Sequence, residues 1–326
     1  MSVLETDRPA AAVPRLALFP ISFFGVVMGI GGLGLAWGKA ETLFGTAFAA
    51  SGWLLALNVA VFAALGAFYL AKLVLHPQAV AADFGHPVRL NFFATLSIGL
   101  LLVAIQLGDA AAARWLWACG AVAHIALTLY VMTAWIHQTK FEITHLNPAW
   151  FLPVVGNVLV PIAGVAHAPA EVSWFFFSVG LVFWLALFTI VLYRLFFHAP
   201  LPVRLTPTLF ILIAPPAVAF VAYHALTGAI DVFARVLYHT ALFLTLLLAS
   251  NAVRFLRARF FLSAWAYTFP LAAVTVATLI MAERTGAAGF AWIGAGLLAV
   301  LTLVVAALFA RTVLAIVRGE ICVEEG

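Results

Sequence analysis

The sequence predicts an all-α polytopic membrane protein with ten transmembrane helices. Of its 326 residues, 66% are hydrophobic and only 9% are charged, and the mean hydropathy is +1.16. Because a soluble domain carries about 25% charged residues, this composition excludes an ordinary soluble enzyme. Apolar stretches close to the roughly 20 residues of one bilayer crossing account for nearly the whole chain. We therefore expect one transmembrane domain that covers residues 1–326.

Ten apolar stretches follow one another between short polar connections. They lie at about 16–37, 47–70, 88–107, 112–136, 148–168, 172–197, 206–226, 229–253, 261–282 and 288–317. They are about twice too long for the strands of an outer-membrane barrel. Residues 1–15 and 318–326 are expected to be short cytoplasmic segments. The start lacks the basic residues of a cleaved signal peptide, so we expect the first helix to remain in the mature protein.

The 16 lysines and arginines divide unequally between alternate connections. One set holds 12, and the other holds four: Lys39, Arg114, Arg235 and Arg284. This split alternates with a count of ten helices, so the basic side predicts that both termini are cytoplasmic. A plasma membrane, in particular a bacterial inner membrane, fits this pattern. The charges are scattered singly, so the net charge of +4 does not indicate nucleic-acid binding.

No proline lies inside an even-numbered stretch. The odd-numbered stretches contain, among others, Pro20, Pro153, Pro161, Pro215, Pro216 and Pro270. Proline removes a backbone hydrogen bond, and the freed carbonyl must face protein or water instead of lipid. The pattern predicts five helical hairpins, with the odd helices forming an inner pore ring and the even helices an outer ring. The alternative is that proline is simply frequent in membrane helices.

The middle of each odd stretch contains no Asp, Glu, Lys, Arg or His. Intramembrane ionisable groups mark pumps and proton-coupled carriers, so their absence favours weak binding and fast passage of an ion. His124 and His239 lie within even stretches, where we expect hydrogen-bonded packing more than ligation of a haem by a membrane oxidoreductase. The other histidines match no zinc pattern, and no phosphate loop occurs. We therefore expect no catalytic residue, metal or cofactor.

Four short motifs occur in order on the third, fifth, seventh and ninth stretches. They are HPVRLNFF at 86–93, VVGN at 154–157 after Asn147–Pro148, APPAVA at 214–219, and WAYTFP at 265–270. Together they resemble the tellurite-resistance/dicarboxylate transporter family, which includes plant slow anion channels and a bacterial tellurite-resistance protein. The resemblance implies a passive channel for small monovalent anions such as chloride and nitrate. It also implies a homotrimer in the lipid bilayer with one pore in each protomer.

A second function within the same family remains open at this point. Some members are named as carriers of dicarboxylate, sulfite or tellurite-type oxyanions, so the alternative is a secondary carrier. The missing intramembrane carboxylate disfavours coupled transport, although a coupling proton can travel on the substrate itself.

The resemblance also indicates site residues. It implies that Phe269 is the pore gate and that Gly25 faces its ring; without the resemblance, Phe269 is one of 29 phenylalanines that pack between helices. Pro270 is expected to disfavour a helical conformation at Phe269 and to bend the ninth helix near its middle. Our candidates for pore lining or helix breaks are Pro20, Gly25, Gly29, Asn91, Pro153, Asn157, Pro215, Pro216, Thr268 and Pro270, together with Ser22 and Thr95.

Arginines near the cytoplasmic ends are expected to make that mouth of the pore positive and to concentrate anions there. These residues are Arg89, Arg204, Arg254, Arg257 and Arg259. For the polar candidates within the stretches, hydrogen bonding between helices is an equally good interpretation.

Overall fold

The computed structural model describes residues 14–46, 49–257 and 259–323. Within these ranges the chain forms helices and no strand, and ten helical spans are long and apolar enough to cross a membrane. This confirms the predicted all-α class and helix number. The first span runs over Ile21–Phe44, several residues later than the predicted 16–37. Most of the expected N-terminal segment 1–15 and residues 324–326 of the C-terminal tail lie outside the described residues.

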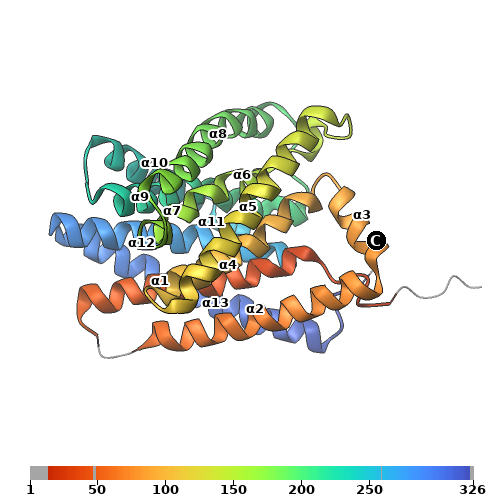
Figure 1. Cartoon of the computed structure of the whole chain (residues 1–326), viewed down its shortest axis with the longest axis horizontal. Coiled ribbons are helices and arrows are strands. Elements are labelled where there is room, and N and C mark those ends of the chain that lie inside the picture. Colours follow the sequence, from red (N-terminus) through yellow and green to blue (C-terminus); the bar gives the residue numbers. More distant parts are fainter. Residues whose placement is uncertain (1–13, 47–48, 258, 324–326) are drawn as a thin grey trace, which may run out of the picture.

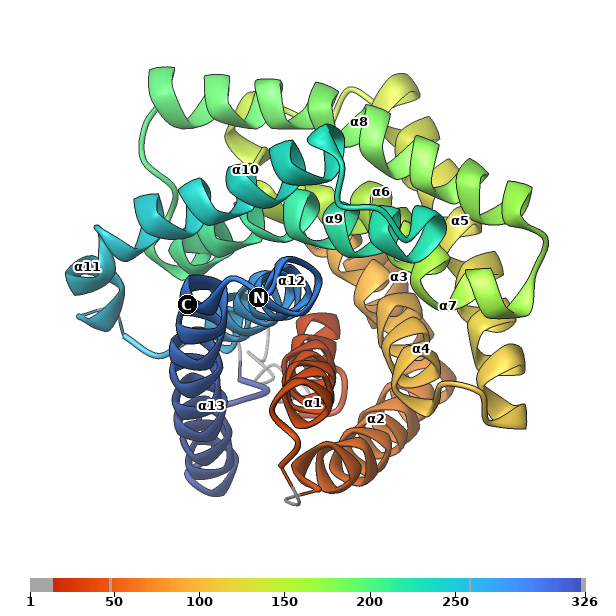
Figure 2. The same cartoon turned by 90° about the vertical axis from the view of Figure 1, so that its left-hand side faces the viewer.

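The even-numbered spans are uninterrupted α-helices. They are α2 (Ala50–Leu75), α5 (Ala111–His137), α8 (Ala170–Phe197), α10 (Val232–Ala249) and α13 (Ala288–Val317). Only 17–39% of each span is buried inside the protein. Their exposed side chains are largely apolar, as expected for helices that face lipid. Figure 2 shows these helices on the outside of the bundle.

The odd-numbered spans are buried to 61–83%, and each begins with a 3-10 segment before it continues as an α-helix. They comprise η1 (Ile21–Phe24) with α1 (Gly25–Phe44); η2 (Arg89–Phe93) with α4 (Ala94–Leu107); η4 (Pro148–Phe151), α6 (Leu152–Val155), η5 (Gly156–Leu159) and α7 (Val160–His167); η6 (Val203–Leu212) with α9 (Ala214–Thr227); and η7 (Leu262–Tyr267) with α12 (Thr268–Thr285). Their α-helices lie inside the outer helices in Figure 2.

The predicted prolines stand where helical segments begin. Pro215 and Pro216 lie in the first turn of α9, and Pro270 lies in the first turn of α12. A proline costs little there, because the first N–H groups of a helix have no partner within the helix. The predicted mid-helix bend at Pro270 is therefore wrong, and Phe269 is itself helical as the second residue of α12.

Short polar side chains stabilise the junctions between 3-10 and α-helix. Thr95 donates to the carbonyl of Phe92 at 2.5 Å, and Thr268 donates to that of Trp265 at 2.7 Å. Thr208 and Asn157 make the same contact with the carbonyl three residues before them. These bonds satisfy carbonyl oxygens at the points where the backbone pattern changes, in a region without water to do so.

Close packing of α1 against α12 depends on glycine. A Cβ added at Gly29 would collide with the hydroxyl of Thr268, and one at Gly32 would lie 2.7 Å from Cβ of Ala272. Both approaches are closer than van der Waals contact, so α1 approaches α12 more closely than any larger residue would allow. Figure 2 shows the two helices side by side.

The two ends of the described chain lie at the same end of the molecule (Figure 1). A Cβ added at Gly319, just after α13, would lie 3.1 Å from the guanidinium of Arg15. This is the arrangement that an even number of crossings requires. Two short helices, α3 (Pro77–Gly85) and α11 (Ala252–Leu256), follow α2 and α10 in the connections at this end.

Candidate functional site

Two apolar cavities lie between the inner spans. The first has a volume of about 70 Å³ and is lined by residues from all five odd-numbered spans. Its lining includes Ser22, Gly25, Phe92, Thr95, Phe151, Gly156, Ile211, Pro215, Trp265, Phe269 and Pro270. A space of this size can hold several water molecules or a small ion. Among the residues that the structure describes, no ionisable side chain lines this cavity.

The second cavity, of about 40 Å³, lies further along the same five spans. Its lining includes Gly32, Leu35, Leu102, Val221 and Val276, and each of these follows the first-cavity residues of its own span in the sequence. Because the odd-numbered spans all run in the same direction, the two cavities follow one another along the bundle. Three residues line both of them: Leu159, Val218 and Phe269.

Phe269 is a partly exposed aromatic side chain between the two cavities. A Cβ added at Gly32 would lie 3.5 Å from Cδ2 of its ring. A Cβ added at Gly25 would instead meet Cβ of Trp265 at 3.5 Å, with no atom of Phe269 within 4 Å. Of these two glycines, Gly32 lies closer to the Phe269 ring, two turns further along α1 than Gly25. Gly25 and Phe269 both line the first cavity, so the expectation that Gly25 faces the ring stays a prediction.

Of the ten candidates for lining or helix breaks, Gly25, Pro215 and Pro270 line the first cavity. The other seven line neither cavity: Pro20, Gly29, Asn91, Pro153, Asn157, Pro216 and Thr268.

The polar candidates among those seven serve the packing of the spans. The Asn157 amide donates to the Thr128 hydroxyl of α5 at 2.9 Å, and the Asn91 amide donates to the carbonyl of Pro87 at 3.3 Å. Hydrogen bonding within and between spans is thus the interpretation that the structure supports for these side chains. Ser22 and Thr95, by contrast, do line the first cavity.

The two histidines within even-numbered spans differ in their surroundings. His124 is fully buried, and its Nδ1 is hydrogen-bonded to the hydroxyl of Ser97 on α4 at 2.8 Å. Its ring lies directly behind Gly156, which lines the first cavity. His239 is exposed on α10. The pair therefore does not converge on one buried site.

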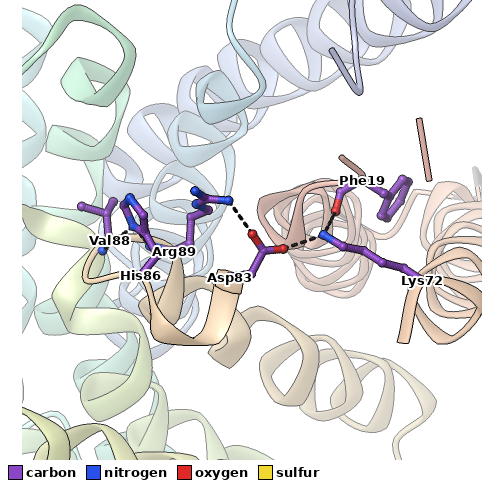
Figure 3. A network of polar contacts seen from close by, with 6 residues as sticks. All are labelled: Phe19, Lys72, Asp83, His86, Val88 and Arg89. Carbon is purple, nitrogen blue, oxygen red and sulfur yellow. Dashed lines mark hydrogen bonds and ion pairs between the residues drawn. The ribbon is translucent and has the colours of Figure 1, made fainter. Parts of the chain in front are cut away.

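Arg89 belongs to a buried ionic network that the sequence did not reveal (Figure 3). Its guanidinium donates to Asp83 at 2.6 Å, and the second carboxylate oxygen of Asp83 accepts from Lys72, also at 2.6 Å. Lys72 donates as well to the carbonyl of Phe19 at 2.8 Å. The side chains of Lys72 and Asp83 are 2% and 6% exposed. Because one carboxylate faces two cations, the network keeps a net positive charge, and the Arg89 side chain is 53% exposed at this end of the molecule.

The remaining arginines of the predicted mouth occupy different places. Arg204 lies at the edge of the first cavity, because its carbonyl accepts a hydrogen bond at 2.5 Å from Ser263, which lines that cavity. Three others are exposed on or just after α11: Arg254, Arg257 and Arg259. Figure 2 shows α11 at the periphery of the bundle. The structure therefore does not bring the five arginines together at one opening.

The inner spans begin on the side of the first cavity that faces the chain ends. At the junctions from 3-10 to α-helix the backbone stays helical, and the N–H groups of Gly25, Ala94 and Thr268 bond to carbonyls of the preceding 3-10 segments. The unpaired N–H groups of each span, and the partial positive charge that they carry, therefore lie at the start of its 3-10 segment. Ser22 and Leu262, in the first turns of η1 and η7, line the first cavity, so these span starts favour an anion there without a charged side chain that would hold it tightly.

These features define a class: a polytopic membrane protein whose buried spans enclose an apolar, uncharged row of cavities. The chain belongs to the SLAC1 family, whose description is voltage-dependent anion channel and whose model matches residues 18–313. This confirms the resemblance that the four motifs indicated.

Curated relatives agree with this assignment. The chain is 31% identical to the S-type anion channel SLAH3 of Arabidopsis thaliana over 95% of its own length and 52% of SLAH3. It is 28% identical to the guard cell S-type anion channel SLAC1 of the same plant, over 83% of this chain and 51% of that protein. It is also 28% identical to the tellurite resistance protein TehA homolog of Haemophilus influenzae, over 67% and 68%. The chain spans about half the length of the plant relatives.

Proposed function

We propose that the chain is a passive channel for small monovalent anions such as chloride and nitrate, with Phe269 occluding the pathway. The observation that carries this proposal is the pair of apolar cavities between the five inner spans, with Phe269 lining both. Membership of a family described as anion channels supports it independently. In this proposal the small anion is the solute that passes through the protein, and the two cavities are parts of its pathway.

The mechanism follows from the chemistry of the lining. A phenylalanine ring in a narrow apolar passage excludes water, and an anion does not cross without its hydration shell or a substitute for it. Displacement of the Phe269 ring joins the two cavities into a continuous space. The anion then meets helix N-termini in place of charged side chains, so it is attracted but not trapped, and passage is fast.

We further propose that the protein assembles as a homotrimer in a plasma membrane, with one pathway in each protomer and both termini in the cytoplasm. The excess of basic residues in the connections on the side of the termini supports this orientation. The large apolar surface of the outer helices supports burial in lipid and against neighbouring protomers.

Recording from purified Phe269→Ala protein in a planar bilayer, where the proposed occlusion is removed, tests the channel function. A passive channel gives a current whose reversal potential follows the Nernst potential of chloride, and then of nitrate, without regard to a pH gradient. A reversal potential that moves with the pH gradient would instead identify a coupled carrier. Dicarboxylate, sulfite and tellurite are the substrates to compare in that case, since one relative is named for tellurite resistance.

A further inference from the structure

The inner spans end in charged and titratable side chains at the end of the molecule opposite the chain ends. We call this group the distal mouth; it consists of Lys39, His224, Glu283 and Arg284. Lys39 follows Leu35 by one turn of α1, and Glu283 follows Val276 by two turns of α12. Leu35 and Val276 both line the second cavity. Since residues four and seven apart share one helix face, the lysine and the glutamate lie beyond this cavity along the pathway.

Direct contacts join the members of the distal mouth. Nζ of Lys39 donates to Oε2 of Glu283 at 2.5 Å, and these side chains are 24% and 36% exposed. Arg284 donates to the carbonyl of Gly228 at the end of α9 at 3.0 Å. His224 lies within electrostatic range of Lys39, Glu283 and Arg284. Charged side chains of α1 and α12, with His224 of α9 near them, therefore lie together at this end of the inner spans.

The backbone makes this end unfavourable for anions. The helices α1, α4, α7, α9 and α12 all have their C-terminal ends here, and each such end carries a partial negative charge. An anion that approaches from this side meets negative helix ends, whereas one in the first cavity meets positive helix starts. Basic side chains are thus needed to offset the repulsion, and Glu283 cancels part of what Lys39 provides.

We propose that Lys39 and Glu283 set the rate at which anions enter the pathway from the distal side. Lys39 supplies the attraction, and Glu283 limits it by pairing with the ammonium group. This inference rests on the proposed channel function. The charges act on the entering anion through its local concentration, so anions that enter from the opposite side are affected less.

Charge variants with opposite expected signs separate this role from a loss of structure. Lys39→Gln and Glu283→Gln are made in the Phe269→Ala background, and chloride flux entering from the distal side is measured at 10 mM and at 1 M salt. A unit charge about 4 Å from an ion in water changes the local ion concentration about fivefold. We expect Glu283→Gln to raise the flux about two- to fivefold at low salt and Lys39→Gln to lower it by a similar factor.

Both effects should fade at 1 M salt, where the Debye length is about 3 Å. The flux of the double variant Lys39→Gln/Glu283→Gln should return close to that of the Phe269→Ala protein, because two neutral glutamines have the same net charge as the ion pair that they replace. Arg235→Gln is the matched control, since Arg235 is an exposed basic residue near the start of the outer helix α10 at the same end of the molecule. It should leave the flux unchanged.

Two results would overturn the inference by itself. One is a decrease in both single variants, which would assign the ion pair a structural role; the other is an effect equal at both salt concentrations. Absence of any anion flux in folded Phe269→Ala protein would overturn the channel function, and this inference with it. The anion flux of the Phe269→Ala protein therefore distinguishes failure of this inference from failure of the channel function.

Discussion

Phe269→Ala removes the aromatic ring that lies between the two cavities, and the structure allows its consequences to be stated in numbers. A fully buried phenylalanine costs about 3–5 kcal/mol when truncated to alanine. The ring of Phe269 already faces open space on two sides and is partly exposed, so it loses fewer contacts. We expect a cost of about 1–3 kcal/mol and a protein that still folds.

The functional effect should be large and positive. Truncation joins cavities of about 70 and 40 Å³, and the apolar constriction that excluded water is lost. Whole-cell anion current, normalised to the amount of protein at the cell surface, should rise strongly above that of the parent. Phe220→Ala is the matched control, because Phe220 is fully buried in α9 and lines neither cavity. It should cost about 3–5 kcal/mol and yield no added current.

An unchanged or reduced current per molecule of Phe269→Ala protein would refute the gating role. Melting curves in detergent complete the comparison, since the gating interpretation requires a smaller loss of stability in Phe269→Ala than in Phe220→Ala. If the two variants lose equal stability and neither gains current, Phe269 is a packing residue like the other phenylalanines of the inner spans.

Three further changes test the local geometry through the melting temperature. Gly32→Ala should destabilise the protein, because its Cβ would lie 2.7 Å from Ala272, whereas Gly25→Ala meets its neighbour at an ordinary 3.5 Å and should be tolerated; equal effects would contradict the packing of α1 on α12. Asp83→Asn leaves the Lys72 ammonium buried without a counter-charge and should cost about 3–5 kcal/mol, with partial recovery when Lys72→Met is added. Asp231 caps α10 outside the membrane span, and hydrogen bonds from the Ala234 N–H and the Tyr223 hydroxyl lower its pKa. A lowered pKa stabilises the folded state above the unfolded pKa, so Asp231→Ala should lower the melting temperature at pH 7, and the difference should shrink below about pH 4.

The helix number could be predicted from the sequence because the bilayer fixes the length of each apolar stretch. Proline placement separated two kinds of span, and the structure shows that these differ in burial, 61–83% against 17–39%. The predicted bend of the helix at Pro270 was wrong. Pro270 lies in the first turn of α12, directly after the 3-10 segment η7, because a helix start tolerates proline where a helix interior does not.

The identity of the lining residues depends on how each span is rotated, and the sequence pattern does not fix that rotation. The inner spans are apolar on nearly all faces, so hydrophobic periodicity does not distinguish the side that faces a cavity from the side that faces a neighbouring helix. Gly25 and Gly32 lie on the same face of α1, two turns apart, and only the packing of α12 decides which of them meets Phe269. Phe269 was indicated by the family motif and not by periodicity; it lines both cavities, and its gating role stays a prediction.

The Lys72–Asp83–Arg89 network was missed for a different reason. Lys72 lies just beyond the predicted stretch 47–70, and Asp83 lies in the same connection, where charged residues are ordinarily solvated. Burial of both became visible only when α3 folded back onto the start of η2. A sequence clue does exist, since His76–Pro77 predicts a turn and a new helix start that returns Asp83 towards Lys72.

In the proposed channel, the separation between uncharged cavities and charged ends of the inner spans has a physical reason. At an effective dielectric constant of about 20, a lysine about 4 Å from an anion attracts it by about 4 kcal/mol, which slows escape roughly a thousandfold. Such a side chain inside the apolar passage would convert a conduit into a binding site. Helix starts around the first cavity supply weaker and more diffuse attraction, whereas full charges such as Lys39 stand in partly hydrated surroundings, where water reduces the same interaction to about 1 kcal/mol. Moving a lysine from position 39 to position 35 on α1, into the lining of the second cavity, should therefore lower the unitary anion conductance while it strengthens anion binding.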